Sequence, residues 1–287
     1  LKFGLDNRQF TLDKENHCIN PSLTSLKKMG KNVAEELYQL SQNYKFENFY
    51  DLMKYLFSKT DNSTTKTSIN KAMLDILIKI DYFSDFGNSK KLLNFVYYYN
   101  ILEGKKAPKK ATISKSISDT NVIRLIEKHS ISTEATYTKF NSGECLKEIW
   151  NNISNDNMGF MEDILNKKDI YGYIDYRNEK IEKRYVLVMD TNTKYSPVIN
   201  TYCLANGATC KCKISKKLWN NDGQLNANDI IYIHAMEKKF GFKKVGETTD
   251  KKGKIKPIFE EDQTKMDWWI TSYSVIHNMD EVLNEIS

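Results

Sequence analysis

A group of three lysines around a glycine, at Lys27, Lys28, Gly30 and Lys31, has the clearest chemistry in the sequence. The group lies in the run LTSLKKMGKNVAEEL, where we expect a tight turn next to the N-terminus of a helix. Backbone N–H groups exposed at such a turn, together with the helix dipole, favour an anion, and adjacent lysines add positive charge. The pattern predicts a phosphate-binding turn.

A second segment of the same kind, INKAMLDILIKIDYFSDFGNSKKLL, follows downstream and contributes Asn70, Lys71 and Lys79. Two helices joined by a tight turn, present twice, are typical of a pair of helix-hairpin-helix elements. Such elements hold duplex DNA by its phosphate backbone. The net charge of +6 suits a polyanionic partner without establishing one.

Candidate catalytic and metal-binding residues are sparse. Nucleotidyl transfer needs two or three aspartates around a pair of metal ions, often from an Asp-x-Asp step, and the sequence contains no such step. Cys203, Cys210 and Cys212, with His234, could be considered for zinc. However, Cys210 and Cys212 are two residues apart on an expected strand and share a face with Ile214, which favours buried thiols. We therefore expect no catalytic residue and no metal site in this chain.

The compartment follows from the cysteine count and the absence of targeting signals. Five cysteines, an odd number, occur without a signal peptide or an apolar run long enough to span a membrane. We expect a cytoplasmic protein with reduced cysteines and no membrane partner. Because the chain begins at Leu1, we also expect it to be a fragment of a longer polypeptide.

Helical spacing of apolar residues dominates the first hundred residues. Ser22, a favoured N-cap residue, is expected to open a helix, and apolar residues recur at helical spacing around Gly30. The polar run Thr60–Ser68 predicts a surface loop. Further helices are expected over residues 46–56, 73–78 and 89–102. The basic run Gly104–Ser118 is expected to be a solvated linker, and residues 119–167 a small helical stretch without an assigned function.

The apolar period changes to two residues from Asp169 onward, which predicts strands. The dipeptide Asn206-Gly207 is a strong hairpin signal, and a short helix is expected at Lys216–Asn221. Five or six strands with a helix between the third and fourth are typical of an OB-fold barrel. The expected strands are Ile170–Tyr176, Arg184–Asp190, Val198–Leu204, Thr209–Ile214, Asp229–Ala235, Phe240–Val245 and a late strand around Trp268, Trp269 and Ile270.

Aromatic and basic residues alternate along these strands. Sites for single-stranded DNA combine rings that stack on bases with cations that follow the backbone. The candidate single-strand residues are Tyr173, Arg184, Tyr185, Lys211, Lys213, Phe242 and Lys243. The fold class we expect is an α+β multidomain protein: a helical helix-hairpin-helix domain at residues 1–103, the linker and helical stretch at 104–167, and a β-barrel (OB-fold) domain at 168–278.

Three blocks of the first hundred residues resemble, in order and spacing, the bacterial or phage DNA polymerase III alpha subunit, the replicative polymerase of family C. The first block is the run LTSLKKMGKNVAEEL. In that family an OB domain lies downstream, as the β-rich half of this chain would require. The other two blocks match at Phe46, Phe49, Asp51 and Leu52, and at Asn70, Lys71, Leu74, Leu77, Ile78, Lys79, Phe83, Gly87, Leu92 and Leu93.

The chain departs from the family pattern in both turns. Lys28 and Asp81 stand where the family has glycine, and Ser89 follows Asn88 where the family has arginine. Glycine lets a backbone approach a phosphate at little conformational cost, whereas Asp81 adds a negative charge. We therefore expect the first hairpin to bind DNA and the second to be structural.

The resemblance implies the C-terminal DNA-binding part of a DNA-directed DNA polymerase, a nucleotidyltransferase. Catalysis, with its Mg²⁺, would belong to an upstream domain, so this segment would need no cofactor. A sliding clamp and other replisome subunits would be partners. Two alternatives stay open: a free-standing, non-enzymatic single-strand-binding or replication accessory protein, and an RNA-binding OB protein. An upstream coding region with Asp-x-Asp steps favours the polymerase, and preference for RNA favours the last alternative.

Overall fold

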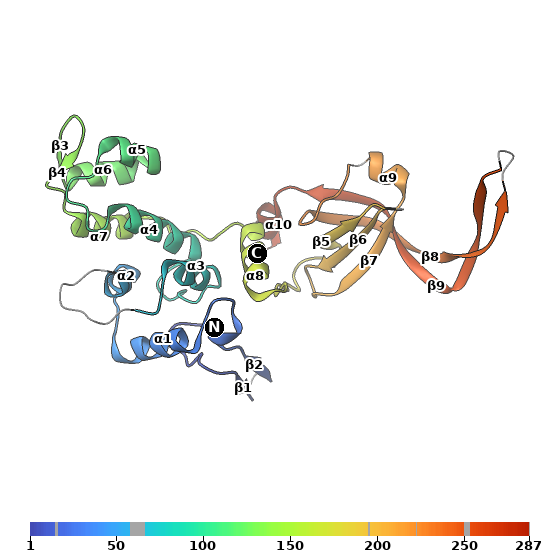
Figure 1. Cartoon of the computed structure of the whole chain (residues 1–287), viewed down its shortest axis with the longest axis horizontal. Helices are drawn as coiled ribbons and strands as arrows, with labels where there is room; N and C mark the ends of the chain where they lie inside the picture. Colours follow the sequence, from blue (N-terminus) through green and yellow to red (C-terminus); the bar gives the residue numbers. More distant parts are fainter. Residues whose placement is uncertain (15–16, 58–66, 195, 222, 250–252, 287) are drawn as a thin grey trace. The chain divides into compact units, whose positions relative to one another are not determined.

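The computed structural model describes residues 1–14, 17–57, 67–194, 196–221, 223–249 and 253–286 (Figure 1). The chain divides into two compact units, Leu1–Ile174 and Asp175–Ser287. The first is helical and the second is built on a five-stranded sheet. The expected α+β organisation is therefore confirmed. Most of the expected loop at Thr60–Ser68 lies outside the described residues.

The helical unit, residues 1–174, contains eight α-helices among its described residues, with one short 3-10 helix and two small hairpins. The 3-10 helix η1 is Leu23–Ser25, and the hairpins pair β1 (Thr11–Asp13) with β2 (Cys18–Asn20) and β3 (Ile131–Ser132) with β4 (Tyr137–Thr138). The helices are α1 (Lys31–Asn43), α2 (Phe49–Phe57), α3 (Lys71–Lys79), α4 (Ser89–Leu102), α5 (Lys110–Ser116), α6 (Thr120–Lys128), α7 (Ser142–Asn152) and α8 (Phe160–Tyr171).

The expected first helix is divided in two. Ser22 caps η1 as predicted, accepting a hydrogen bond from the backbone N of Thr24 at 3.1 Å. The chain then leaves the helical conformation at Leu26, and Lys28 has a positive φ of 66°. Helix α1 starts only after Gly30. The tight turn expected in this run is therefore confirmed. The helical spacing of apolar residues on both sides of Gly30 does not mark one helix, because two helices joined by a turn can show the same spacing.

One hydrophobic core runs through the whole helical unit and includes residues beyond the expected boundary at 103. Trp150 of α7 packs against Phe49 of α2 and Phe95 of α4, with ring centroids 6.0 and 5.2 Å apart. In the expected basic linker, Ile113 and Ile117 are buried and α5 is helical. The interpretation of residues 104–118 as a solvated tether is wrong, because these two isoleucines anchor the segment to the core.

The second unit, residues 175–287, holds five strands that pair in the closed order β5-β6-β7-β9-β8. Neighbours are antiparallel except β7 and β9, which run parallel with Ile214 opposite Ile270. The helix α9 (Lys216–Asn221) lies between β7 and β8, as predicted. The strands are β5 (Tyr185–Asn192), β6 (Val198–Cys203), β7 (Thr209–Ile214), β8 (Ile230–Thr249) and β9 (Ile255–Ile276), and helix α10 (Met279–Ile286) follows them.

Alternation along these strands sends aliphatic side chains into a separate core. Val188, Ile199, Ile231 and Ile270 are fully or almost fully buried there, and Trp219 of α9 packs with them. Tight turns with φ > 0 favour glycine, and Gly207 has φ of 73° in the β6–β7 turn. The predicted Asn-Gly hairpin is therefore confirmed.

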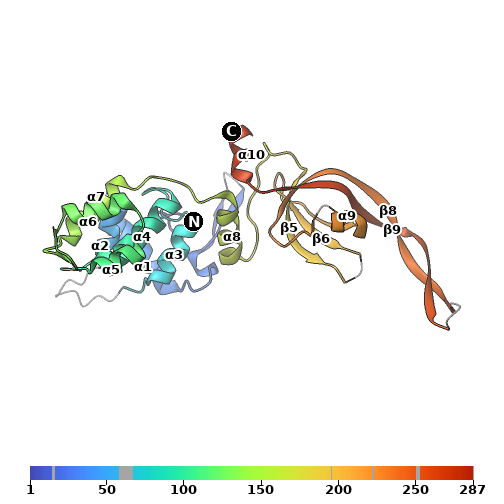
Figure 2. The same ribbon diagram turned by 90° about the horizontal axis from the view of Figure 1, so that it is seen from above.

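Two strand predictions need correction. In the segment expected as the strand Ile170–Tyr176, the first two residues instead end helix α8, which Gly172 closes in the left-handed conformation at φ 84°, and residues 173–176 follow in irregular conformation. Ile170 is buried in the core of the helical unit, and this packing outweighs its β propensity. The strands expected at Asp229–Ala235 and Phe240–Val245 are one strand, β8, which pairs along its length with β9. The paired ends of β8 and β9 project from the barrel as a two-stranded arm, seen in Figures 1 and 2.

Candidate nucleic-acid interface

The first turn, residues 26–30, presents the N-terminus of α1 with its amides uncapped by any side chain. Gly30 is the N-cap residue in an extended conformation, and within the described residues no atom lies within 4 Å of where its side chain would begin. The first amides of a helix have no partner within the helix and favour an anion. Lys31, the first residue of α1, is exposed beside them.

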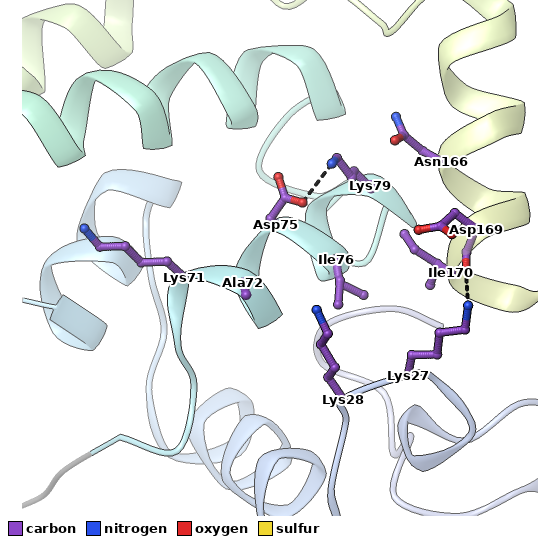
Figure 3. A pocket seen from close by; sticks show the side chains of 10 residues that line it. All are labelled: Lys27, Lys28, Lys71, Ala72, Asp75, Ile76, Lys79, Asn166, Asp169 and Ile170. Atoms are coloured by element: carbon purple, nitrogen blue, oxygen red, sulfur yellow. Dashed lines mark hydrogen bonds and ion pairs between the residues drawn. The ribbon is translucent and has the colours of Figure 1, made fainter.

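Next to this turn lies a cleft of about 470 Å³, shown in Figure 3. It gathers side chains from the first turn, from α3 and from α8. Four lysines face two aspartates in its lining, so the cleft carries excess positive charge. The lining residues are Lys27, Lys28, Lys71, Ala72, Asp75, Ile76, Lys79, Asn166, Asp169 and Ile170.

The four cleft lysines have different surroundings. The ammonium of Lys27 donates to the backbone oxygen of Asp169 at 3.1 Å, and Lys79 pairs with Asp75 at 2.8 Å. Lys28 extends toward Ile76, and Lys71 lies at the far end of the cleft (Figure 3). Within the part of the chain that the structure describes, neither Lys28 nor Lys71 forms an ion pair. These two lysines therefore contribute charge that the protein leaves uncompensated.

The second turn, between α3 and α4, is occupied by the protein's own groups. Asp81 has a φ of 60°, accepts a hydrogen bond from the Ser89 hydroxyl and pairs with Lys167 at 2.7 Å. The backbone N of Asn88 donates to the Asn155 side chain at 2.8 Å. Burial alone lowers the pKa of Lys167, but hydrogen bonds to Asp81 and Asp163 outweigh it and raise that pKa. Asp81 thus serves as an internal anchor at this turn.

Of the predicted duplex-binding residues, the structure brings Lys27, Lys28, Lys71 and Lys79 into one cleft. Gly30 and Lys31 adjoin it in the chain at the start of α1. Asn70 instead caps α3, accepting from the backbone N of Met73 at 3.0 Å. The sequence did not reveal the α8 residues of the lining. Asn166 lies in the weakly patterned stretch 119–167, Ile170 was expected in a strand, and nothing in the sequence brings α8 next to the first turn.

In the barrel, Lys211 and Lys213 project from β7 on the face opposite Cys212 and Ile214, as alternation predicted. Lys213 pairs with Asp267 at 2.6 Å and lies 5.7 Å from the ring of Trp269. Lys211 is exposed, and among the described residues it has no ion-pair partner. On this face, therefore, Lys213 is already paired with a carboxylate, whereas Lys211 points to solvent.

The other predicted single-strand residues are spread over three places. Arg184 is exposed, and Tyr185 is half-buried against Tyr232, with ring centroids 4.8 Å apart. Phe242 and Lys243 are exposed on the β8–β9 arm. Tyr173 is exposed but follows α8, within the helical unit, so it does not belong to the barrel strands.

The cysteines of the barrel face inward. Cys203 and Cys212 are buried, and the sulfur atoms of Cys210 and Cys212 are 3.6 Å apart. Burial raises the pKa of the Cys212 thiol to about 12, which disfavours the thiolate that metals bind. Over the described ranges, no three His, Cys, Asp or Glu side chains gather as metal ligands would.

Comparison with known protein families gives a match that covers both turns. Residues 6–93 match the helix-hairpin-helix motif. This match supports nucleic-acid binding by that part of the helical unit. No curated protein and no solved structure matches the chain. Among the helices that the structure describes, none is long and apolar enough to cross a membrane.

Proposed function

We propose that the helical unit binds duplex DNA by its phosphate backbone through the first turn, residues 26–31. The observation that supports this most is the convergence of the uncapped N-terminus of α1 with the lysine-lined cleft. A phosphate beside Gly30 would accept hydrogen bonds from the first amides of α1. Lys27, Lys28 and Lys31 would supply charge at the same point. Such contacts fix the position of a duplex and do not read its sequence.

The second turn takes no part in this proposal. Its αL position holds Asp81, whose carboxylate is engaged by Ser89 and Lys167. The amide of Asn88 at the start of α4 is already bonded to Asn155. A phosphate at this turn would have to displace these partners and approach a carboxylate. The second hairpin therefore acts as a support that holds α3 and its lysines beside the first turn.

For the second unit, we infer an OB fold that binds single-stranded DNA. Support comes from the closed strand order with the parallel β7–β9 pair, and from α9 between the third and fourth strands. Single-strand binding needs positive charge and surfaces on which bases stack. Exposed Lys211 on β7 would supply the first, and the exposed rings of Phe242 and Phe259 on the β8–β9 arm would supply the second. Lys238 already lies 4.7 Å from the ring of Trp268, an arrangement in which cation and ring share one surface.

Both units together suit the C-terminal DNA-binding region of a DNA polymerase III alpha subunit, with polymerisation and its Mg²⁺ belonging to another part of the polypeptide. This segment by itself would be non-catalytic, and incorporation of nucleotides by it above background would contradict that role. The competing candidate is a non-enzymatic single-strand-binding accessory protein. A coding region upstream that carries Asp-x-Asp steps would favour the polymerase.

Neutralising the first turn tests the duplex site. We expect Lys27→Gln, Lys28→Gln and Lys31→Gln together to weaken binding of a fluorescent duplex. The slope of log K against log salt should fall by about two to three units, since each lost phosphate contact removes about 0.9. Fluorescence anisotropy over a series of salt concentrations measures both quantities.

The matched control removes the same charge elsewhere in the helical unit. Lys45, Lys54 and Lys115 are exposed and do not line the cleft at the first turn. Changing these three to Gln should leave the salt slope nearly unchanged. Equal effects of the two triple variants would mean that only overall charge matters, and the first turn would not be the phosphate site.

A further inference from the structure

A second basic surface lies in the helical unit, outside the residues that match the helix-hairpin-helix motif. A hollow of about 520 Å³ is lined by three lysines, Lys105, Lys106 and Lys139. The rest of its lining is uncharged: Gly104, Phe140, Asn141 and Ser142. We call Lys105, Lys106 and Lys139 the basic patch.

The backbone beneath the basic patch is fixed. The segments 105–110 and 135–140 are joined by hydrogen bonds from Phe140 N to Lys106 O at 3.1 Å and from Tyr137 N to Pro108 O at 3.0 Å. A third bond runs from Lys110 N to Ala135 O at 2.9 Å. Pro108, Tyr137 and Phe140 are buried. The lysines are therefore held on a scaffold, unlike cations on a mobile tether, and less ordering entropy opposes binding.

The charge of the basic patch is not compensated by the protein. All three lysines are exposed, and within the described ranges none of them forms an ion pair. The run from Gly104 to Lys110 contains four lysines and no acidic residue. Elsewhere in this unit several lysines have carboxylate partners, among them Lys2 with Asp85 and Lys128 with Glu148. Lysines that lie close together on an ordered backbone, without ion-pair partners, favour binding of a polyanion.

The lysines, and not the nearby helix end, carry this site. Helix α7 begins beside the hollow, but the side chain of Asn141 already accepts a hydrogen bond from the backbone N of Glu144 at 3.2 Å. The basic patch shares no residue with the cleft at the first turn. Figures 1 and 2 both place α5 and the adjoining segments at the end of the helical unit away from α8.

We propose that the basic patch is a second contact to the phosphate backbone of duplex DNA. This inference rests on the proposed function, because it requires the helical unit to bind a duplex. A unit of this length has a diameter of about 40 Å, which a duplex covers in about twelve base pairs. A duplex longer than that is long enough to span the distance between the first turn and the basic patch, where each would add phosphate contacts.

The full chain with Lys105→Gln, Lys106→Gln and Lys139→Gln tests the proposal. The probe is a fluorescent duplex of about 30 base pairs, titrated at several salt concentrations. We expect a salt slope smaller by about two to three units and an affinity that falls at least several-fold at low salt. The Lys45, Lys54 and Lys115 variant is the control for loss of charge. Because all three patch lysines are exposed, thermal melting should be unchanged.

The outcomes separate this inference from the proposed function. A patch variant that behaves like the control, while the first-turn variant loses affinity and slope, overturns the second contact and leaves the duplex function in place. If the patch variant and the first-turn variant each keep wild-type affinity, the second contact and the proposed duplex function are both overturned. Loss of slope in each variant, with an additive loss when the two are combined, supports two separate phosphate contacts on one duplex.

Discussion

Lys28 and Asp81 each occupy a left-handed backbone position, with φ of 66° and 60°, where glycine is the unstrained residue. At the first turn the strain keeps a cation next to the N-terminus of α1. At the second turn it aims a carboxylate at Ser89 and Lys167. The same backbone conformation thus has different uses at the two turns, because the Lys28 side chain is exposed to solvent whereas the Asp81 side chain completes an internal network.

The strain at Lys28 gives a prediction in which stability and binding change in opposite directions. Lys28→Gly relieves a left-handed conformation that costs about 1–2 kcal/mol, against an entropy cost for glycine of about 0.5–1 kcal/mol. We expect the free energy of unfolding to rise by up to about 1 kcal/mol while duplex affinity falls, because one cation is lost. Denaturant titration and anisotropy on the same protein measure the two changes.

Lys27→Gly is the control for this prediction. Lys27 is adjacent and has the same charge, but its φ is not positive. Glycine there adds chain entropy without relieving strain, and it removes the hydrogen bond from Lys27 to the backbone oxygen of Asp169, so the free energy of unfolding should fall. If Lys28→Gly destabilised the protein as much as Lys27→Gly, the left-handed position would not be a source of strain.

At the scale of elements, the sequence predicted those helices and turns whose conformation depends on residues close together in the chain. The helix at Ser89–Leu102, the short helix α9 and the β6–β7 hairpin were predictable because caps, apolar spacing and an Asn-Gly turn act over a few residues. The conformation of residues 170–176 was not predictable, because Ile170 is buried by parts of the chain that are distant in sequence. The cleft was only half predictable for the same reason: its lysines stand out in the sequence, whereas α8 reaches them only through the tertiary fold.

The β8–β9 arm supplies a prediction at this scale. Phe242 and Phe259 are 65% and 57% exposed on neighbouring strands, an unusual exposure for rings in a folded protein. Stacking on a base is worth about 1–3 kcal/mol per ring, so Phe242→Ala with Phe259→Ala should weaken single-strand binding at least about fivefold. Because both rings are exposed, thermal melting should change little. Titration with a labelled oligonucleotide measures the affinity.

An aliphatic control distinguishes stacking from loss of apolar area. Ile255 and Ile258 are exposed on the same arm, at 63% and 42%. Changing both to Ala should affect single-strand affinity much less, because an aliphatic side chain has no π face for a base. Equal losses in the two variants would indicate that the arm contacts its partner through apolar area alone.

At the scale of the whole molecule, each unit has its own core. The core of the helical unit includes residues from Leu23 to Ile170, and the barrel core includes residues from Val186 to Tyr273. The sequence predicted a β-rich domain from residue 168, close to the observed start at residue 175, but it divided the helical part at residue 103. The boundary depends on α5 to α8 packing against α2, α3 and α4, which is a tertiary fact. The expected division at residue 103 would cut through this core.

This boundary predicts how fragments of the chain behave. Residues 1–174 and 175–287 should each unfold cooperatively, whereas residues 1–103 should not. Removing α7 strips Ile149 and Trp150 from the core, where Trp150 contacts Phe49 and Phe95. Truncating a large buried side chain costs about 2–5 kcal/mol, so losing several exceeds the roughly 5–15 kcal/mol that stabilises a domain. Thermal melts followed by circular dichroism measure the cooperativity.

The two folding fragments should also divide the ligands between them. Residues 1–174 contain the first turn and the basic patch, the two sites that we propose to contact phosphates, so this fragment should prefer duplex to single strand and show a steep salt dependence. Residues 175–287 contain Lys211, Lys213 and the exposed rings of the arm, so this fragment should prefer single strands, weakly and with little sequence preference. Competition between labelled duplex and single strand, run on each fragment, measures both preferences. If residues 175–287 bound the two forms equally, or if Lys211→Gln with Lys213→Gln had no effect, the barrel would act as a spacer or a protein-docking module, and DNA binding would belong to the helical unit alone.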